Sequence, residues 1–147
     1  MTDLRDAVVA EAATWLRTPY AHAGRIKGAG VDCATLLAEV FARAGVIAPV
    51  EIAAYPPDWH LHRSEERYLA LVLAHAREIP PAAARPGDVA LWKWGRTFAH
   101  GAIIMPPGWP AIIHAWMEAG MVTLDHGDGG RLAGRPVRFF SVLEGAP

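Results

Sequence analysis

Residues 28–37 read GAGVDCATLL and hold the only cysteine of this 147-residue chain. Cys33 directly follows Asp32, a residue type favoured at helix N-caps. The apolar residues behind it recur at helical spacing: Leu36, Leu37, Val40 and Phe41. We therefore predict a helix that starts at Val31 or Asp32 and is closed by Gly45, with the thiol in its first turn, on the apolar side.

Length and charge limit the kinds of protein to consider. A chain of 147 residues suffices for one domain, which we place at residues 1–147, with about 70% of its unfolded surface buried. The formal net charge of −1, with acids and bases interspersed, argues against nucleic acid as a partner. The N-terminus lacks the pattern of a secretory signal and no segment has 18 consecutive apolar residues, so we expect synthesis in the cytoplasm and no membrane insertion.

The first half of the chain has the periodicity of helices. Helical spacing extends over about the first 17 residues, with Thr2 or Asp3 as cap, and Pro19 ends the pattern. The stretch YAHAGRIKGAGVD, residues 20–32, holds three glycines and a basic pair and is predicted to form a loop up to the start of the second helix. A third helix is predicted from Ser64 to about Arg77.

From Pro86 onward the period changes from 3.6 to 2. Five short runs rich in β-branched and aromatic residues follow one another: GDVALWKW, FAHGAIIM, PAIIHAW, GMVTLDH and PVRFFSVL. The order of helices first and strands second predicts an α+β fold, with N-terminal helices packed on a C-terminal antiparallel β-sheet.

Two histidines lie on neighbouring strands of that predicted sheet. If PPGWP, residues 106–110, is the hairpin turn, His100 and His114 are directly opposite and about 5 Å apart on one face. A register shifted by two residues makes them diagonal neighbours on the same face. Because the apolar stripe of the cysteine helix should pack on the sheet, we expect Cys33 and both imidazoles to converge between helix and sheet.

That convergence predicts nucleophilic catalysis. A helix N-terminus and a nearby imidazolium should lower the pKa of the Cys33 thiol to roughly 3.5–7.5, which makes the thiolate the resting nucleophile. His100 would serve as base and then as acid, and His114 would orient it.

The same residues carry a resemblance to a known family. In order along the chain, TPYAHAGRIKGAGVDCATLLAEVFARAGV, RPGDVALW, AHGAIIM and IIHAW resemble the motifs of the NlpC-type cell-wall cysteine peptidases, a papain-like superfamily. The resemblance implies Cys33 as nucleophile, His100 as base and His114 as third residue. It also implies that Tyr20 faces the substrate and helps to stabilise the oxyanion, while Asp32 supports the helix start.

Within that superfamily the chain is most similar to the branch encoded in phage-tail and gene-transfer-agent clusters, on the basis of an insert at about residues 48–80 that contains YPPDWHLHRSEERYL. This resemblance implies a peptidoglycan stem peptide as substrate, cleaved between D-γ-glutamate and the diamino acid. It also implies tail or tail-like particle proteins as partners, and action on the cell wall after delivery by such a particle.

The chain departs from the family pattern directly after the cysteine. Family members usually have Ser and Gly there, whereas this chain has Ala34 and Thr35, so a hydroxyl is missing or displaced by one position. Arg25 and Lys27, in the preceding loop, are candidates for contacting substrate carboxylates.

Other functions use the same residues. His60 and His62 form an H-x-H pair that suggests a metal site, but zinc sites usually show several short-spaced ligand pairs, so no metal and no cofactor is predicted. A non-catalytic tail component that keeps the fold for docking, a thiol acyltransferase and a metal-dependent hydrolase stay open as alternatives.

Overall fold

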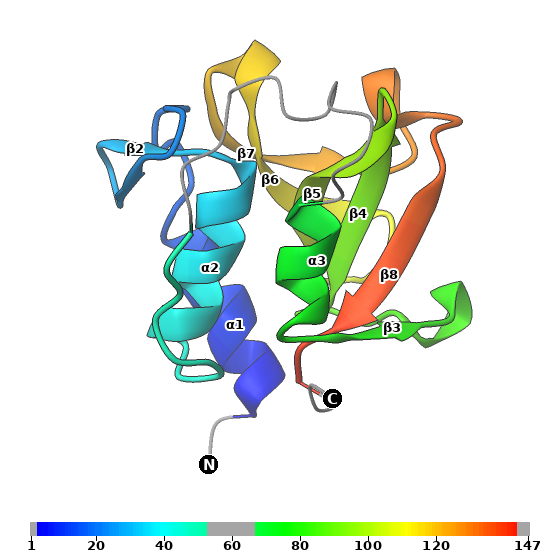
Figure 1. Ribbon diagram of the computed structural model, residues 1–147, viewed down its shortest axis with the longest axis horizontal. Helices are drawn as coiled ribbons and strands as arrows, with labels where there is room; N and C mark the ends of the chain where they lie inside the picture. The colour runs from blue at the N-terminus through cyan, green and yellow to red at the C-terminus, as the bar shows by residue number, and fades with distance from the viewer. Residues whose placement is uncertain (1–2, 53–66, 144–147) are drawn as a thin grey trace.

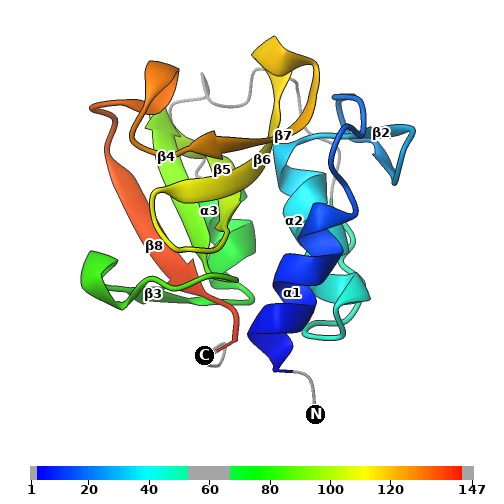
Figure 2. The same ribbon diagram turned by 180° about the vertical axis from the view of Figure 1, so that it is seen from behind.

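The computed structural model describes residues 3–52 and 67–143 (Figures 1 and 2). Within these ranges three α-helices lie beside a six-stranded antiparallel sheet, which confirms the predicted α+β class. They are α1 (Leu4–Ala13), α2 (Cys33–Arg43) and α3 (Arg67–Leu73). Short 3-10 turns connect several of the strands. None of the helices in the described ranges is long and apolar enough to cross a membrane.

The helix starts follow from their capping residues. Asp3 caps α1 through a hydrogen bond from the Arg5 N–H, at 2.9 Å. Asp32 caps α2, which ends at Arg43 just before Gly45, a glycine with φ of +81°. Asp3 is one of the two caps predicted for the first helix, whereas α2 begins at Cys33, one residue after the predicted Asp32. The first helix is shorter than predicted because it gives way to turns after Ala13.

The sheet has six antiparallel strands in the order β3-β8-β4-β5-β6-β7. Their bounds are β3 (Arg77–Ile79), β4 (Val89–Trp94), β5 (Thr97–Ile104), β6 (Ala111–Trp116), β7 (Met121–His126) and β8 (Val137–Ser141). The last five correspond to the five predicted runs. The middle strands are buried on both faces, and successive residues of β4 belong in turn to the apolar clusters on the two sides of the sheet.

Two predictions about local structure are wrong. The third helix ends at Leu73, and Arg77 starts strand β3, which pairs with β8 at the edge of the sheet. The segment after Tyr20 is not all loop, since β1 (Arg25–Ile26) and β2 (Gly30–Val31) form a small hairpin before α2. The predicted cap Ser64 lies outside the described residues.

Each face of the sheet has its own apolar cluster. The larger cluster lies between sheet and helices, where Cys33, Leu36 and Val40 of α2 pack with Ala99 and Ile103 of β5. The smaller one covers the opposite face and includes Trp92, Ala102 and Ile112. The predicted apolar stripe of the cysteine helix is thus buried as expected.

Candidate active site

Cys33 is the first residue of α2 and is 7% exposed. Its Sγ lies 3.7 Å from the carbonyl oxygen of Ala99, the residue that directly precedes His100 on β5. The thiol therefore lies against the backbone of the strand that carries the predicted base.

Asp32 holds the start of this helix through several hydrogen bonds. Its Oδ1 accepts from the N–H groups of Ala34 at 3.0 Å and Thr35 at 2.9 Å, while Oδ2 accepts from the N–H of Ala23 at 2.8 Å. The Thr35 hydroxyl accepts from the Asp32 N–H at 2.9 Å, which completes a capping box. Thr35 thus fixes the turn that carries the thiol.

Tyr68 of α3 also contacts the cysteine turn, a contact that the sequence did not predict. Its hydroxyl donates to the carbonyl oxygen of Cys33 at 2.7 Å, and the ring is 2% exposed. The hydroxyl packs so tightly against Gly101 that a Cβ there would overlap it. The side chain therefore joins α3, the cysteine turn and β5.

The predicted resting thiolate is wrong for this structure. Burial, and after it the negative charge of Asp32, raises the pKa of the Cys33 thiol above its ordinary range. The N–H groups of Gly101 and of Cys33 itself, and the Tyr68 hydroxyl, oppose this rise only in part. The thiol is therefore protonated at neutral pH, and a base must remove its proton during the reaction.

His100 and His114 are in direct contact through their rings. The Nε2 atom of His100 lies 2.8 Å from the Nδ1 atom of His114. Strands β5 and β6 pair Ile103 with Ile113 and Ile104 with Ile112, so the two histidines are diagonal neighbours and not directly opposite. The shifted register is the correct one of the two alternatives, and the contact survives because both rings share one face.

A carboxylate continues this chain of contacts. The Nε2 atom of His114 lies 3.1 Å from Oδ2 of Asp125 on β7, two residues beyond the ladder partner Thr123. His114 is fully buried, whereas the Asp125 side chain is 43% exposed. The sequence prediction missed Asp125, although a carboxylate on the strand after the His114 strand was a usable signal.

The carboxylate fixes the direction of the hydrogen bonds. A carboxylate only accepts, so His114 donates its Nε2–H to Asp125 and accepts at Nδ1 from the Nε2–H of His100. This tautomer leaves Nδ1 of His100 with a lone pair, as a general base requires.

Burial keeps both imidazoles neutral. It lowers the pKa of His100 well below its ordinary 6.5, and the neighbouring His114 and Arg135 lower it further. Burial also lowers the pKa of His114, while Asp125 raises it in part. A neutral His100 at pH 7 can accept the proton of the thiol.

The expected position of the histidines between helix and sheet is wrong. His100 packs against Trp92, with ring centroids 5.7 Å apart, on the face of the smaller apolar cluster. In the described ranges the thiol makes its hydrogen bond with Ala99 and not with the His100 ring. The cysteine turn and the imidazoles therefore approach the same stretch of β5 from its two faces.

Tyr20 lies beside the cysteine turn. It forms a bridge with Val31 and its N–H donates to the Gly120 carbonyl at 2.8 Å. Burial, and after it the neighbouring Cys33 and Asp32 groups, raises the pKa of the Tyr20 hydroxyl, which therefore stays a hydrogen-bond donor. Its role toward substrate stays a prediction.

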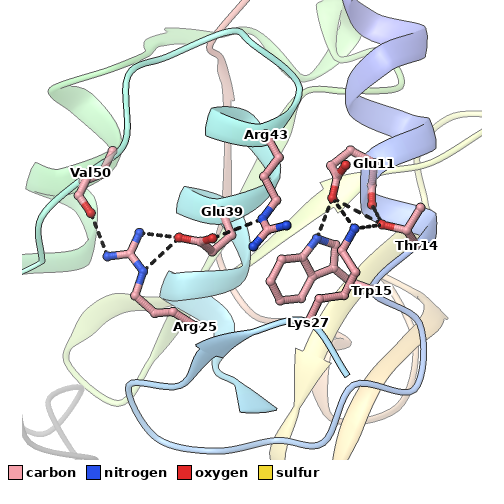
Figure 3. Close-up of polar contacts among 8 residues, drawn as sticks. All are labelled: Glu11, Thr14, Trp15, Arg25, Lys27, Glu39, Arg43 and Val50. Atoms are coloured by element: carbon pink, nitrogen blue, oxygen red, sulfur yellow. Dashed lines mark hydrogen bonds and ion pairs between the residues drawn. The ribbon is translucent and has the colours of Figure 1, made fainter. Parts of the chain in front are cut away.

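Arg25 and Lys27 are engaged within the protein (Figure 3). Arg25 pairs with Glu39 at 2.7 Å and donates to the Val50 carbonyl at 2.6 Å. Lys27 pairs with Glu11 at 2.8 Å. Both charges are thus already balanced, and their predicted contact with substrate carboxylates gains no support from these positions. The pair His60 and His62 lies outside the described residues.

Solved structures share this fold. The NlpC/p60 domain of the peptidoglycan hydrolase SagA has 20% identity and a TM-score of 0.60, covering 91% of this chain and 96% of that one. The peptidoglycan hydrolase RipB of Mycobacterium tuberculosis has 21% identity and a TM-score of 0.63, covering 95% and 64%. RipD of the same organism, a non-catalytic NlpC/p60 domain protein adapted to peptidoglycan binding, has 19% identity and a TM-score of 0.64, covering 97% and 100%.

The sequence matches no family model and no curated protein. Similarity at 19–21% identity establishes the fold and leaves the activity open. The chain has the fold of NlpC/p60 domains.

Proposed function

We propose that this protein is a cysteine peptidase that hydrolyses a peptide bond in the stem peptides of bacterial peptidoglycan. The observation that carries the proposal is the 2.8 Å contact between His100 and His114, next to the residue whose carbonyl contacts the Cys33 thiol. A buried core pair of histidines would need neither a cysteine at a capped helix start nor a carboxylate behind the second ring. The hydrolases SagA and RipB, with the same fold, support the substrate class.

Acylation begins with proton transfer. Nδ1 of His100 takes the thiol proton while Sγ of Cys33 bonds to the carbonyl carbon of the substrate. In the free protein the thiol and the ring form no hydrogen bond and lie on opposite faces of β5, so this step requires the His100 side chain to turn toward Sγ when substrate binds. The N–H of Cys33 and the Tyr20 hydroxyl are the proposed donors to the oxyanion.

The intermediate then collapses and the carbon–nitrogen bond breaks. His100 returns its proton to the leaving amine, and the acyl group stays on sulfur as a thioester. A water molecule attacks the thioester, gives one proton to His100 and releases the acid. His100 finally reprotonates sulfur, so one peptide bond and one water yield one acid and one amine.

His114 and Asp125 act on this cycle through His100. When His100 is protonated, the Asp125 carboxylate and His114 stabilise the positive charge through the two hydrogen bonds. They also hold the tautomer that presents Nδ1 to the thiol. Both are positioning residues in this scheme.

The proposed bond joins D-γ-glutamate to the diamino acid, and the proposed carrier is a phage tail or gene-transfer-agent particle that delivers the protein to the cell wall. Both rest on the motif resemblance. The test is incubation of purified sacculi with the protein and mass analysis of the fragments. Products with a new amine on the diamino acid are expected, whereas sugar-chain fragments, or an intact wall beside digested casein, contradict the proposal.

A second candidate is a non-catalytic docking or peptidoglycan-binding component. The observations that favour it are the nearly buried thiol with its raised pKa and the precedent of RipD, which has this fold without catalysis. Binding of sacculi without any released fragment would select this candidate.

A further inference from the structure

An arginine stacks on one of the aromatic side chains beside His100. Trp94, the last residue of β4, has its ring centroid 6.2 Å from that of His100 and 5.5 Å from that of Trp116. The guanidinium carbon of Arg135 lies 3.5 Å from the centroid of Trp94. A cation is thus stacked on a ring that borders the proposed general base.

Arg135 differs from the other cations near the site because no carboxylate balances it in the described part of the chain. Arg25 pairs with Glu39, and Arg131 pairs with Glu118. Arg135 instead donates to two carbonyl oxygens, from Nε to Arg131 at 2.7 Å and from Nη1 to Lys93 at 3.4 Å.

The stacking and the two bonds fix the direction of the guanidinium. Neither bond uses Nη2, so this edge of the planar group can donate to an anion. Arginine binds carboxylates through this fork geometry, and stacking on a tryptophan reduces the side-chain freedom that binding would cost. The charge also reaches His100, since Arg135 contributes to the lowered pKa of that ring.

The position beside His100 indicates which half of a substrate meets this arginine. The ring that protonates the leaving amine must lie within hydrogen-bond distance of it. Side chains packed against His100 therefore border the residue that leaves as an amine. In a stem peptide that residue is the diamino acid, whose side chain ends roughly 7 Å from its α-nitrogen.

We propose that Trp94 and Arg135 form a subsite for the side-chain carboxylate of the diamino acid. This inference rests on the proposed function and deepens it. Diaminopimelate bears a carboxylate at the end of its side chain and lysine does not. The protein should therefore prefer stem peptides of the diaminopimelate type over those of the lysine type.

The test measures binding in a variant that cannot turn over substrate. The Kd values of L-alanyl-γ-D-glutamyl-diaminopimelate and of the lysine counterpart are measured by calorimetry with the Cys33→Ala protein. We expect the diaminopimelate peptide to bind about tenfold more tightly, with a preference that shrinks as salt is added. Adding Arg135→Gln should abolish the preference. Arg43→Gln is the matched control, because Arg43 also lies over a tryptophan, at 5.4 Å from Trp15, but on α2 and paired with Glu39.

Equal Kd values for the two peptides, a preference that survives Arg135→Gln, or no binding of either peptide would overturn the subsite. If Arg135→Gln does not fold, the comparison of the two peptides over a range of salt concentrations still decides. Cleavage of both peptides by the wild-type protein is measured separately. Selective binding without cleavage would reject the proposed hydrolysis and support the subsite. Equal binding of the two peptides with cleavage would support hydrolysis and reject the subsite.

Discussion

His100 and His114 contact each other through ring nitrogens 2.8 Å apart, although the register of their strands does not place them opposite each other. The contact is diagonal across the β5–β6 ladder, and the ring of Trp116 stacks on His114 with an interplanar angle of 15°. Trp116 therefore helps to hold the orientation of His114. This orientation directs one nitrogen to His100 and the other to Asp125.

This arrangement predicts a hierarchy of activity losses. His100→Ala should lower kcat by about a thousandfold or more, because it removes the group that moves the proton. His114→Ala should cost less, and Asp125→Asn less again, because these residues act through His100. Steady-state hydrolysis of a stem tripeptide measures all three.

A readout besides the rate separates positioning from simple structural damage. Asp125→Asn removes the charge that raises the pKa of His114, so the protonated His100–His114 pair becomes less stable. The acid limb of the pH–rate profile should therefore move to lower pH. Equal and small losses at His100 and His114 would identify both as core histidines without a catalytic role.

Folding stability should fall in acid because of the same two rings. Their folded pKa values lie below the ordinary 6.5 of the unfolded chain, so below pH 6.5 the unfolded state binds more protons. The free energy of unfolding should thus be steady above pH 6.5 and decline as the pH drops from there. Urea titrations at several pH values measure this slope.

The matched pair of variants for this slope is His114→Gln and His126→Gln. Removal of the buried His114 should flatten the decline, whereas removal of the exposed His126 should leave it unchanged. A slope that is the same in wild type and His114→Gln would contradict the assignment of a depressed pKa to this ring.

Alkylation of the thiol should be slow. Burial raises the pKa of Cys33, and only the thiolate reacts with iodoacetamide, so modification at pH 7 should be slower than that of a free cysteine. Mass spectrometry of the intact protein over time provides the rate. Unfolding in urea should bring the alkylation rate to that of a small thiol. A higher rate in the native protein would contradict the raised pKa and support an activated thiolate.

A buried ion pair should dominate the attachment of α1. Arg5 and Asp88 lie 2.8 Å apart with side chains 10% and 0% exposed, and Arg5 also donates to the Pro86 carbonyl. Asp88→Ala removes the carboxylate that balances this buried positive charge and should lower the free energy of unfolding by about 3–5 kcal/mol. The exposed pair of Arg138 and Glu78 is the control, and Glu78→Ala should cost less than about 1 kcal/mol. Similar losses in the two variants would contradict this assignment.

The sequence predicted the elements whose signal is local. The α2 start needs only Asp32 and the apolar stripe, and the five long strands follow from their alternation and turn residues. Even the shared face of His100 and His114 follows from a period of two, whichever register applies. These features depend on residues close together in the chain.

The predictions that were wrong or missing concern features that depend on contacts between segments distant in the sequence. The strand at Arg77 forms because β8 offers an edge to pair with, and nothing in the three residues themselves announces it. The raised pKa of Cys33 reflects burial under the folded chain, which competes with the helix N-terminus that the prediction relied on. Tyr68 reaches the cysteine turn only because α3 packs on β5, and that contact has no local pattern.

The most direct test of the account compares wild type with Cys33→Ala on the tripeptide L-alanyl-γ-D-glutamyl-diaminopimelate. Alanine keeps the capped start of α2 and removes only sulfur, so circular dichroism should show the same fold in both proteins. The initial rate of release of the free diamino acid, followed by mass spectrometry, is the measurement. Wild type should release the diamino acid steadily, and Cys33→Ala should release none above the uncatalysed background. Release by the alanine variant at the wild-type rate would contradict the role of Cys33 as nucleophile.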